Sequence, residues 1–276
     1  MEQDFEELLE VVESIARGDY SGRIMAYCRP GRPEPLRRLA EAVGLMMVGI
    51  EAREYRLKEL IGELEDANAR LRQGVVGAVA AMGRAIAARD VDTRGHSDRV
   101  ACLAEMLGRA VGVTGEDLDN LRIGGLMHDI GKIGFDDDIL HNESSLPDPE
   151  MLERIRRHPQ VGADILESLD FLGVVREYVL RHHERPDGKG YPMGLTSDQI
   201  PFGAKIVAVA DVFDALTSDR SYQKGKTRAE ALAIMRSLAG KGLDADLTDT
   251  FARLIAGKGL PWKPSGAPAT PRTASG

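Results

Sequence analysis

Residues 126–134 have the sequence LMHDIGKIG, in which apolar residues flank the pair His128-Asp129. Lys132 follows three residues after Asp129, so an imidazole, a carboxylate and an ammonium group lie within a short stretch of chain. Such a set can hold a divalent cation and can also contact an anionic oxygen. A buried His-Asp pair in an apolar helix is equally often structural, so the interpretation depends on the other histidines.

The histidines taken together favour a metal site. Of the six in the chain, all but His141 lie in or beside segments with helical periodicity, and these five are His96, His128, His158, His182 and His183. Their spacing makes no local metal motif, but a helical bundle can bring such residues to one place. Asp211 lies in the apolar segment 207–214, where an unpaired carboxylate is costly. Imidazole and carboxylate ligands together suit iron, manganese or zinc.

The composition excludes several classes of protein. The net charge of -8 argues against binding to a nucleic-acid polymer. Cys28 and Cys102 are too few for a disulfide framework, which fits a reducing compartment. The acidic N-terminus lacks the pattern of a signal peptide, and the apolar run 45–50 is too short to span a bilayer. We therefore expect a cytoplasmic protein without a membrane span.

Residues 1–74 are predicted to form a helical segment for dimerisation and signalling. An amphipathic helix over 2–17 precedes a connector rich in glycine and proline over 18–35. Apolar residues then recur at seven-residue intervals, at Leu36, Val43, Ile50, Leu57, Leu64 and Leu71. This heptad repeat favours a parallel coiled-coil homodimer, and a single long helix packed on its own domain is the alternative. Residues 16–24, with the connector and helix that follow, resemble a HAMP module, which implies signalling protein partners.

Residues 75–260 are predicted to form one mostly helical domain. The helical windows are 75–90, 97–111, 116–130, 149–169, 171–183, 203–217, 227–240 and 246–256. No run of residues alternates with period two, so no sheet is expected and the fold class is all-α. The tail 261–276 is rich in Pro, Ser, Thr, Ala and Gly and is expected to be disordered.

A second dense stretch, HHERPDGKGYP, covers residues 182–192. It begins with two adjacent imidazoles and passes into a glycine-rich turn. A polar surface loop is the alternative, but the density of metal ligands and phosphate-binding donors, including Arg185, favours a site. Three other motifs fail. A zincin lacks its second histidine at Asp187, a P-loop lacks a glycine at Leu126 and a hydroxyl residue at Ile133, and no serine or cysteine occupies a nucleophile elbow.

Together these stretches resemble the HD-GYP domain, the branch of the HD phosphohydrolases that degrades cyclic di-GMP. The resemblance covers residues 75–257. Its motifs occur in order as ARD at 88–90, GHS at 95–97, HDIGKIG at 128–134, HP at 158–159, HHE at 182–184, GYP at 190–192, IP at 200–201 and DVFDALT at 211–217. The family implies an HD-domain helical bundle, here preceded by a long coiled-coil helix. It also implies two or three divalent metal ions, most plausibly iron or manganese.

The resemblance assigns ligands by position. The implied ligands of one ion are His96, His128, Asp129 and Asp211. Those of a second ion are His158, His182 and His183, with Asp129 bridging the two. Asp92, four residues before His96, is hypothesised as the ligand of a third ion, because some members of the family have a carboxylate there.

The resemblance also assigns substrate contacts. Asp129 and Lys132 are the expected catalytic residues, and Lys132 would contact a phosphate oxygen. The sequence does not identify the general acid, for which a metal-bound water and Asp214 are the two candidates. The expected substrate-binding residues are Lys132, Arg185, Tyr191, Asp214 and Arg220.

The implied function is hydrolysis of cyclic di-GMP to linear pGpG and then GMP. Metal ions would polarise the phosphodiester and activate a water. Departures from the family pattern, such as Gln223 where a basic residue is common, leave two alternatives open. One is hydrolysis of another cyclic dinucleotide. The other is a non-catalytic domain that senses cyclic di-GMP and passes a signal to partner proteins.

Overall fold

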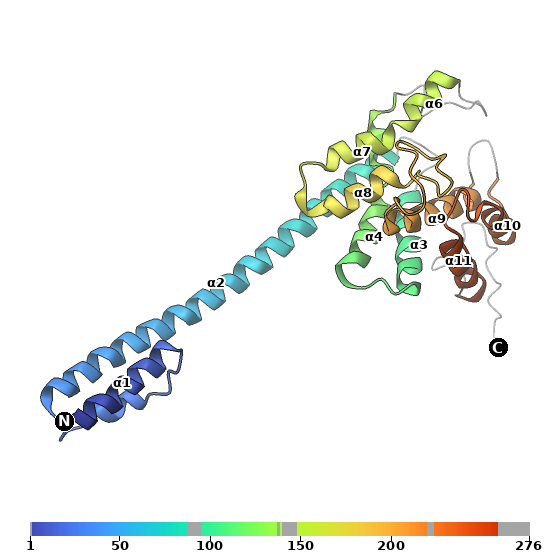
Figure 1. The fold of residues 1–276 in the computed structure, drawn as a ribbon. Coiled ribbons are helices and arrows are strands. Elements are labelled where there is room, and N and C mark those ends of the chain that lie inside the picture. The colour runs from blue at the N-terminus through green and yellow to red at the C-terminus, as the bar shows by residue number, and fades with distance from the viewer. Residues whose placement is uncertain (1, 88–94, 137–138, 140–147, 220–223, 259–276) are drawn as a thin grey trace, which may run out of the picture. The chain divides into compact units, whose positions relative to one another are not determined.

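The computed structural model describes residues 2–87, 95–136, 139, 148–219 and 224–258. In these residues the regular elements are helices, apart from two isolated β-bridges, so the predicted all-α class is confirmed. The chain divides into two compact units, Met1–Gln73 and Gly74–Gly276. Helix α2 (Glu34–Ala87) contributes residues to both (Figure 1). Among the described helices, none combines the length and the apolar character that crossing a bilayer requires.

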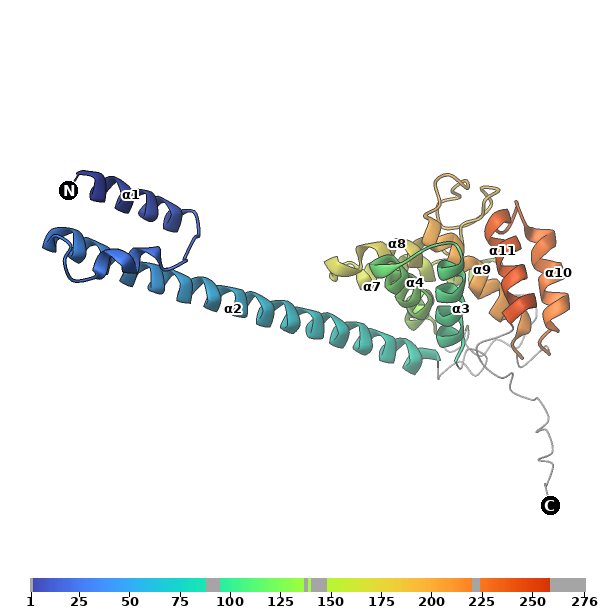
Figure 2. The same cartoon turned by 90° about the horizontal axis from the view of Figure 1, so that it is seen from below.

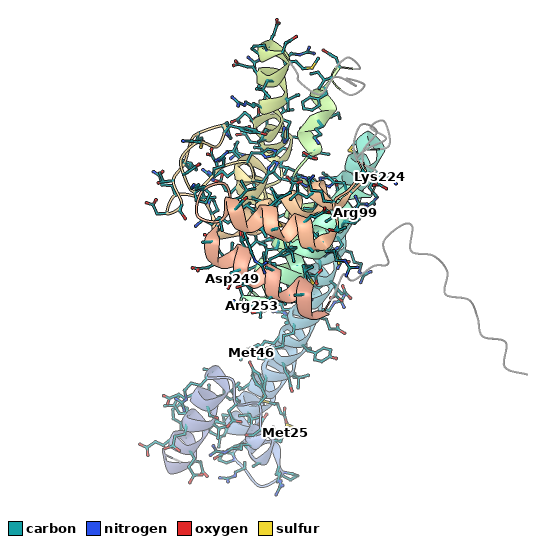
Figure 3. The ribbon with its side chains drawn as sticks, turned by 90° about the vertical axis from the view of Figure 1, so that its right-hand side faces the viewer. Met25, Met46, Arg99, Lys224, Asp249 and Arg253 are labelled. Carbon is teal, nitrogen blue, oxygen red and sulfur yellow. The ribbon has the colours of Figure 1, made fainter. Side chains whose placement is uncertain are left out.

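The first unit contains α1 (Glu2–Ala16), η1 (Arg23–Cys28) and the first part of α2. Apolar residues of all three elements form its core, namely Leu8, Val11, Ile15, Ile24, Tyr27, Leu36, Ala40, Val43 and Met47. Met25 of η1 and Met46 of α2 project from the surface instead, and Figure 3 labels both. The unit is thus a small helical hairpin with a core of its own.

The heptad residues of α2 fall into two classes. Leu36 and Val43 are buried in the core of the first unit, where α1 and η1 of the same chain cover them. The four later members, Ile50, Leu57, Leu64 and Leu71, are 43% to 69% exposed. Of these heptad positions, only those from Ile50 onward are therefore exposed and able to contact a partner helix.

The second unit is built around α9 (Phe202–Thr217). Its apolar segment 206–210 is buried throughout. Helices α3 (His96–Ala110) and α4 (Gly115–Met127) pack on one side, and α10 (Arg228–Leu238) and α11 (Ala245–Lys258) pack on another (Figures 1 and 2). Because α9 is central, the carboxylates that it carries point into the domain and not into solvent.

A smaller apolar core lies beneath the HD stretch. It contains Met127 and Ile130, the residues on either side of His128-Asp129. Its other buried members come from α7 (His158–Leu166), η4 (Asp170–Leu172) and α8 (Gly173–Arg181), and they are Leu166, Leu172, Val175 and Val179. Val76 and Val79 of α2 pack against it. The HD pair therefore rests on a packed apolar base.

One predicted helix is wrong. The window 149–169 divides at Arg157 into α6 (Pro149–Arg156) and α7. Pro159 has no N–H to offer the Ile155 carbonyl, so the continuous helix would lose that hydrogen bond. The Nδ1 atom of His158 donates to this carbonyl instead, at 2.8 Å. The break thus turns the His158 side chain into a cap for the end of α6.

The HD pair also lies at a helix end. The window 116–130 is helical only to Met127, and η3 (Ile130–Gly134) follows. Other predicted features lie outside the described residues: the motif at 88–90, Asp92, His141, Arg220, Gln223 and the tail 261–276.

Candidate metal centre

Two groups of metal-ligating side chains lie side by side in the second unit. Within each group the ligand atoms lie within 4.8 Å of one another. The first group contains His96, His128 and Asp129. The second group contains His158, His182 and His183. The centre thus joins the start of α3, the end of α4, the break between α6 and α7 and the end of α8.

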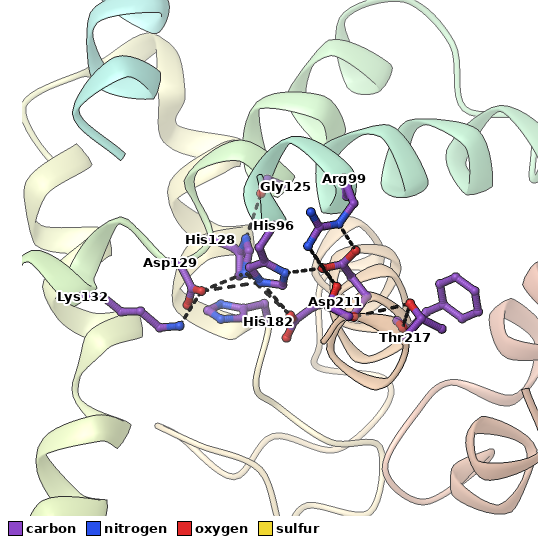
Figure 4. Close-up of polar contacts among 12 residues, drawn as sticks. His96, Arg99, Gly125, His128, Asp129, Lys132, His182, Asp211 and Thr217 are labelled. Carbon is purple, nitrogen blue, oxygen red and sulfur yellow. Dashed lines mark hydrogen bonds and ion pairs between the residues drawn. The ribbon is translucent and has the colours of Figure 1, made fainter. Parts of the chain in front are cut away.

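Asp211 joins the first group from α9. Its Oδ1 atom lies 3.2 Å from Nε2 of His96 and 3.8 Å from Nε2 of His128. The two imidazole Nε2 atoms are themselves 3.2 Å apart. Figure 4 shows both rings turned toward Asp211 and Asp129. Four ligand atoms therefore converge on one point, as the resemblance implied for one metal ion.

Asp129 faces both groups. Its Oδ2 atom lies 3.3 Å from Nε2 of His128, and its Oδ1 atom lies 3.4 Å from Nε2 of His158. The ammonium of Lys132 is 2.7 Å from Oδ2 (Figure 4). One carboxylate thus offers a separate oxygen to each group, with a cation beside it.

Three imidazoles are oriented in the same way. The Nδ1 atoms of His128, His158 and His182 lie 2.7–2.8 Å from the carbonyls of Gly125, Ile155 and Val179. These carbonyls belong to the last turns of α4, α6 and α8, where the regular hydrogen bonds along a helix end. A carbonyl can only accept, so each Nδ1 carries the proton. Each Nε2 lone pair is therefore free to face the centre.

The second group favours neutral imidazoles. Burial, reinforced by the neighbouring histidines, lowers the pKa of His183 to about 3. The same causes hold the pKa of His182 well below its ordinary value. Burial also lowers the pKa of His158, against the nearby Asp129 carboxylate. Neutral imidazole is the form that binds metal ions.

The first group carries charge. Burial opposes ionisation of Asp129 and Asp211, but Lys132 and His128 hold the pKa of Asp129 well below its usual range. His96 has the same effect on the pKa of Asp211. Burial alone would lower the pKa of His96, but its hydrogen-bonded carboxylates outweigh it and raise the pKa to about 9. Asp129 and Asp211 are therefore ionised, the form in which a carboxylate binds a metal ion.

The main chain joins the two groups at Gly131. A Cβ atom there would lie 1.9 Å from the carbonyl oxygen of His158 and 2.6 Å from the nitrogen of Gly162. Such a contact is possible only for glycine, so η3 can approach α7 backbone to backbone. The spacing between the HD pair and His158 depends on this contact.

The loop after His182-His183 closes over the second group. Glu184 is 3% exposed and accepts hydrogen bonds from the backbone N–H groups of Met193 and Leu195 at 2.6 and 2.8 Å. These two bonds tie the far side of the loop to the helix end. Tyr191 lies in the loop between Glu184 and Met193, and its ring stacks on His183 with the ring centroids 4.7 Å apart. The guanidinium of Arg156 lies 5.6 Å from the Tyr191 ring centroid.

Two predicted substrate residues lie away from the ligand atoms. Arg185 pairs with Asp187 at 2.7 Å within the loop. Asp214 is 1% exposed and contacts the Nδ1 edge of His96, opposite the edge that faces Asp211. Sequence reasoning missed Arg99 and Arg156 and gave Glu184 no role. The one available signal was the position of Arg99, one helical turn after His96 on α3.

Comparisons with known proteins identify the family. The sequence model of the HD domain family matches residues 81–247. The cyclic di-GMP phosphodiesterase response regulator RpfG of Xanthomonas campestris is 34% identical over 220 residues, which cover 79% of this chain and 55% of RpfG. The cyclic di-GMP phosphodiesterase PA4108 of Pseudomonas aeruginosa is 42% identical over 161 residues, covering 58% of this chain and 38% of that protein. The chain thus spans about half or less of these relatives.

A solved structure shares the fold. The cyclic GMP-AMP specific phosphodiesterase V-cGAP3 of Vibrio cholerae superposes with a TM-score of 0.52 at 19% identity, over 66% of this chain and 49% of that one. Because the family model matches more than half of the chain, the chain belongs to the HD-domain family, as its resemblance to the HD-GYP domain predicted.

Proposed function

We propose that this protein is a metal-dependent phosphodiesterase that hydrolyses a cyclic dinucleotide, with cyclic di-GMP as the first candidate. The observation that carries the proposal is the position of Asp129, whose two oxygens face two separate ligand groups. A carboxylate shared between two ions would hold them close together, as two-metal hydrolysis of a phosphodiester needs. The names of RpfG and PA4108 support cyclic di-GMP as the substrate.

The donor set fits two divalent ions. The first ion would be held by His96, His128, Asp129 and Asp211, and the second by His158, His182, His183 and Asp129. Imidazole with carboxylate favours iron or manganese over calcium or magnesium. Once bound, two such ions would neutralise phosphate charge and activate a water. A third ion at Asp92 stays a prediction.

The protein's own side chains prepare the site for an anion. Lys132 brings positive charge to the edge of the centre, where it can stabilise charge that develops on phosphate oxygens. Arg156 lies over Tyr191 on the side of the second group, and both can contact the nucleotide. Arg185, Tyr191 and Arg220 stay predicted substrate contacts.

The decisive experiment loads the protein anaerobically with iron or manganese and adds cyclic di-GMP, 3′3′-cGAMP or a mononucleotide. We expect cyclic di-GMP to give pGpG, and faster cleavage of 3′3′-cGAMP would reassign the substrate within the same chemistry. Asp129→Ala should lose bound metal and activity together. If loaded wild-type protein binds cyclic di-GMP but cleaves neither cyclic dinucleotide over hours, the domain is a sensor and the enzymatic proposal fails.

We also propose that α2 forms a parallel homodimer from Ile50 onward. Ile50, Leu57, Leu64 and Leu71 recur at the same heptad position and are all exposed in the single chain. Leu57→Asp with Leu64→Asp should give a monomer by sedimentation. The matched control, Ala52→Asp with Ala69→Asp, adds the same charge off the seam and should stay dimeric. A dimer in the leucine variant would disprove this seam.

A further inference from the structure

His96 differs from the other oriented imidazoles in its place on a helix. His128, His158 and His182 follow helix ends, where unpaired carbonyls accept from Nδ1. His96 is instead the first residue of α3. The start of a helix leaves unpaired N–H groups and not carbonyls, so α3 itself cannot offer this ring the same acceptor. An acceptor for Nδ1 has to come from another element.

Asp214 of α9 provides that acceptor. Its Oδ2 atom lies 2.7 Å from Nδ1 of His96, and its side chain is 1% exposed. Asp211, three residues earlier on α9, lies 3.2 Å from the Nε2 atom of the same ring. One turn of helix therefore places a carboxylate on each nitrogen of His96, one beside the ligand atoms and one on the opposite edge.

Arg99 keeps the buried carboxylate in place. Its Nε donates to Oδ1 of Asp214 at 2.6 Å, and a terminal nitrogen donates to Oδ2 at 2.9 Å. The Ser218 hydroxyl donates to Oδ2 at 3.1 Å. Together with the His96 contact, these donors occupy both oxygens of Asp214, so the carboxylate is placed to accept hydrogen bonds inside the domain and not to reach a substrate as a general acid.

We propose that Asp214, held by Arg99, is the positioning residue of His96. When metal binding displaces the Nε2 proton of His96, Asp214 would keep the remaining ring proton on Nδ1 and hold Nε2 toward the first ligand group. This inference rests on the proposed metal centre and moves Asp214 from the substrate, where the sequence placed it, to a position behind a ligand. A hydrogen-bonded carboxylate behind a metal-binding imidazole fixes the ring and increases its basicity.

Manganese binding to the full chain tests the proposal. Equilibrium dialysis with metal analysis should show two ions in wild-type protein. Asp214→Asn removes the charge and places an amide that can donate to Nδ1, so the affinity of the first group should fall by about 10–100-fold. The second group should keep its affinity, and the variant should hold close to one ion. Ser218→Ala removes a hydroxyl that contacts Asp214 and Arg99 but leaves the carboxylate and its two bonds to Arg99 in place, so it should behave as wild type.

The outcomes separate this inference from the proposed function. Two ions of wild-type affinity in Asp214→Asn would overturn the positioning role, whatever the enzyme hydrolyses. Metal-loaded wild-type protein that cleaves no cyclic dinucleotide would overturn the function and leave the positioning result standing. Should the variant not fold, histidine ¹⁵N spectra of zinc-loaded wild-type protein decide. The ring proton of His96 is expected on Nδ1, and a proton on Nε2 would refute the proposal.

Discussion

Acid should destabilise the metal-free protein through the second ligand group. His183 has a pKa of about 3 in the folded chain and about 6.5 when unfolded. As the pH falls below about 6.5, the unfolded chain takes up a proton that the folded chain refuses. The stability from neutral His183 is therefore complete above that pH and is lost progressively below it.

The magnitude follows from the two pKa values. Each pH unit between them corresponds to about 1.4 kcal/mol, so lowering the pH from 7.5 to 5.0 removes about 2 kcal/mol through His183. His96 acts in the opposite direction, because its pKa is raised to about 9. Its contribution is complete below about pH 6.5 and is lost as the pH rises through about 9. Over the same interval it adds about 1.4 kcal/mol.

Urea unfolding in the presence of a chelator measures both contributions. Between pH 7.5 and 5.0, the unfolding free energy of His183→Gln should fall by about 2 kcal/mol less than that of wild type. The unfolding free energy of His96→Gln should fall by about 1.4 kcal/mol more than that of wild type over the same interval. If His183→Gln lost as much stability as wild type over this interval, the burial argument for neutral imidazoles would be refuted.

Three further substitutions test other parts of the site. Gly131→Ala places Cβ 1.9 Å from the His158 carbonyl, so thermal unfolding should show a loss at the upper end of about 1–3 kcal/mol, with weaker manganese binding. Glu184→Gln leaves one buried loop N–H without a good acceptor, a local cost of about 1–3 kcal/mol that should appear as faster hydrogen exchange around Tyr191. Arg156→Met removes an exposed cation worth about 1 kcal/mol, so KM for cyclic di-GMP should rise about fivefold while kcat stays unchanged.

Each of these substitutions has a matched control. Gly134→Ala adds the same methyl where the nearest atom is 3.8 Å away, and it should be tolerated. Glu150→Gln changes an exposed carboxylate and should leave loop exchange as in wild type. Arg157→Met removes the neighbouring exposed arginine and should not alter KM. Equal effects in a substitution and its control would count against the specific contact.

The helical class was predictable because its signals are local, whereas the predicted ligand set came from the resemblance of several separate motifs to one family. Apolar periodicity of 3.6 residues marks the helices, and an aspartate within an apolar run, such as Asp211, indicates a buried partner. The break at Arg157 also had a local signal, since Pro159 cannot continue the hydrogen bonds of a helix. The apolar periodicity over 149–169 nevertheless predicted one continuous helix.

Other features depended on contacts between distant residues. Asp211 and Asp214 lie one turn apart in the same apolar run, and only the packing of α9 against α3 decides which edge of His96 each one meets. The heptad repeat likewise identifies an apolar stripe on the helix but does not show which element packs against it. Leu36 and Val43 are covered by the chain's own first helix, because the connector is long enough to fold α1 back.

The contact at Gly131 separates two properties of the centre. The ligand side chains would determine which ion each group binds. The distance between the two groups is instead set by the backbone contact of η3 with α7 at Gly131. A change of ligand, such as one that favours manganese over iron, therefore leaves that interval intact. The metal preference of such a protein can therefore change with the metals that a cell provides. The distance between the two ligand groups, on which the proposed reaction depends, stays the same.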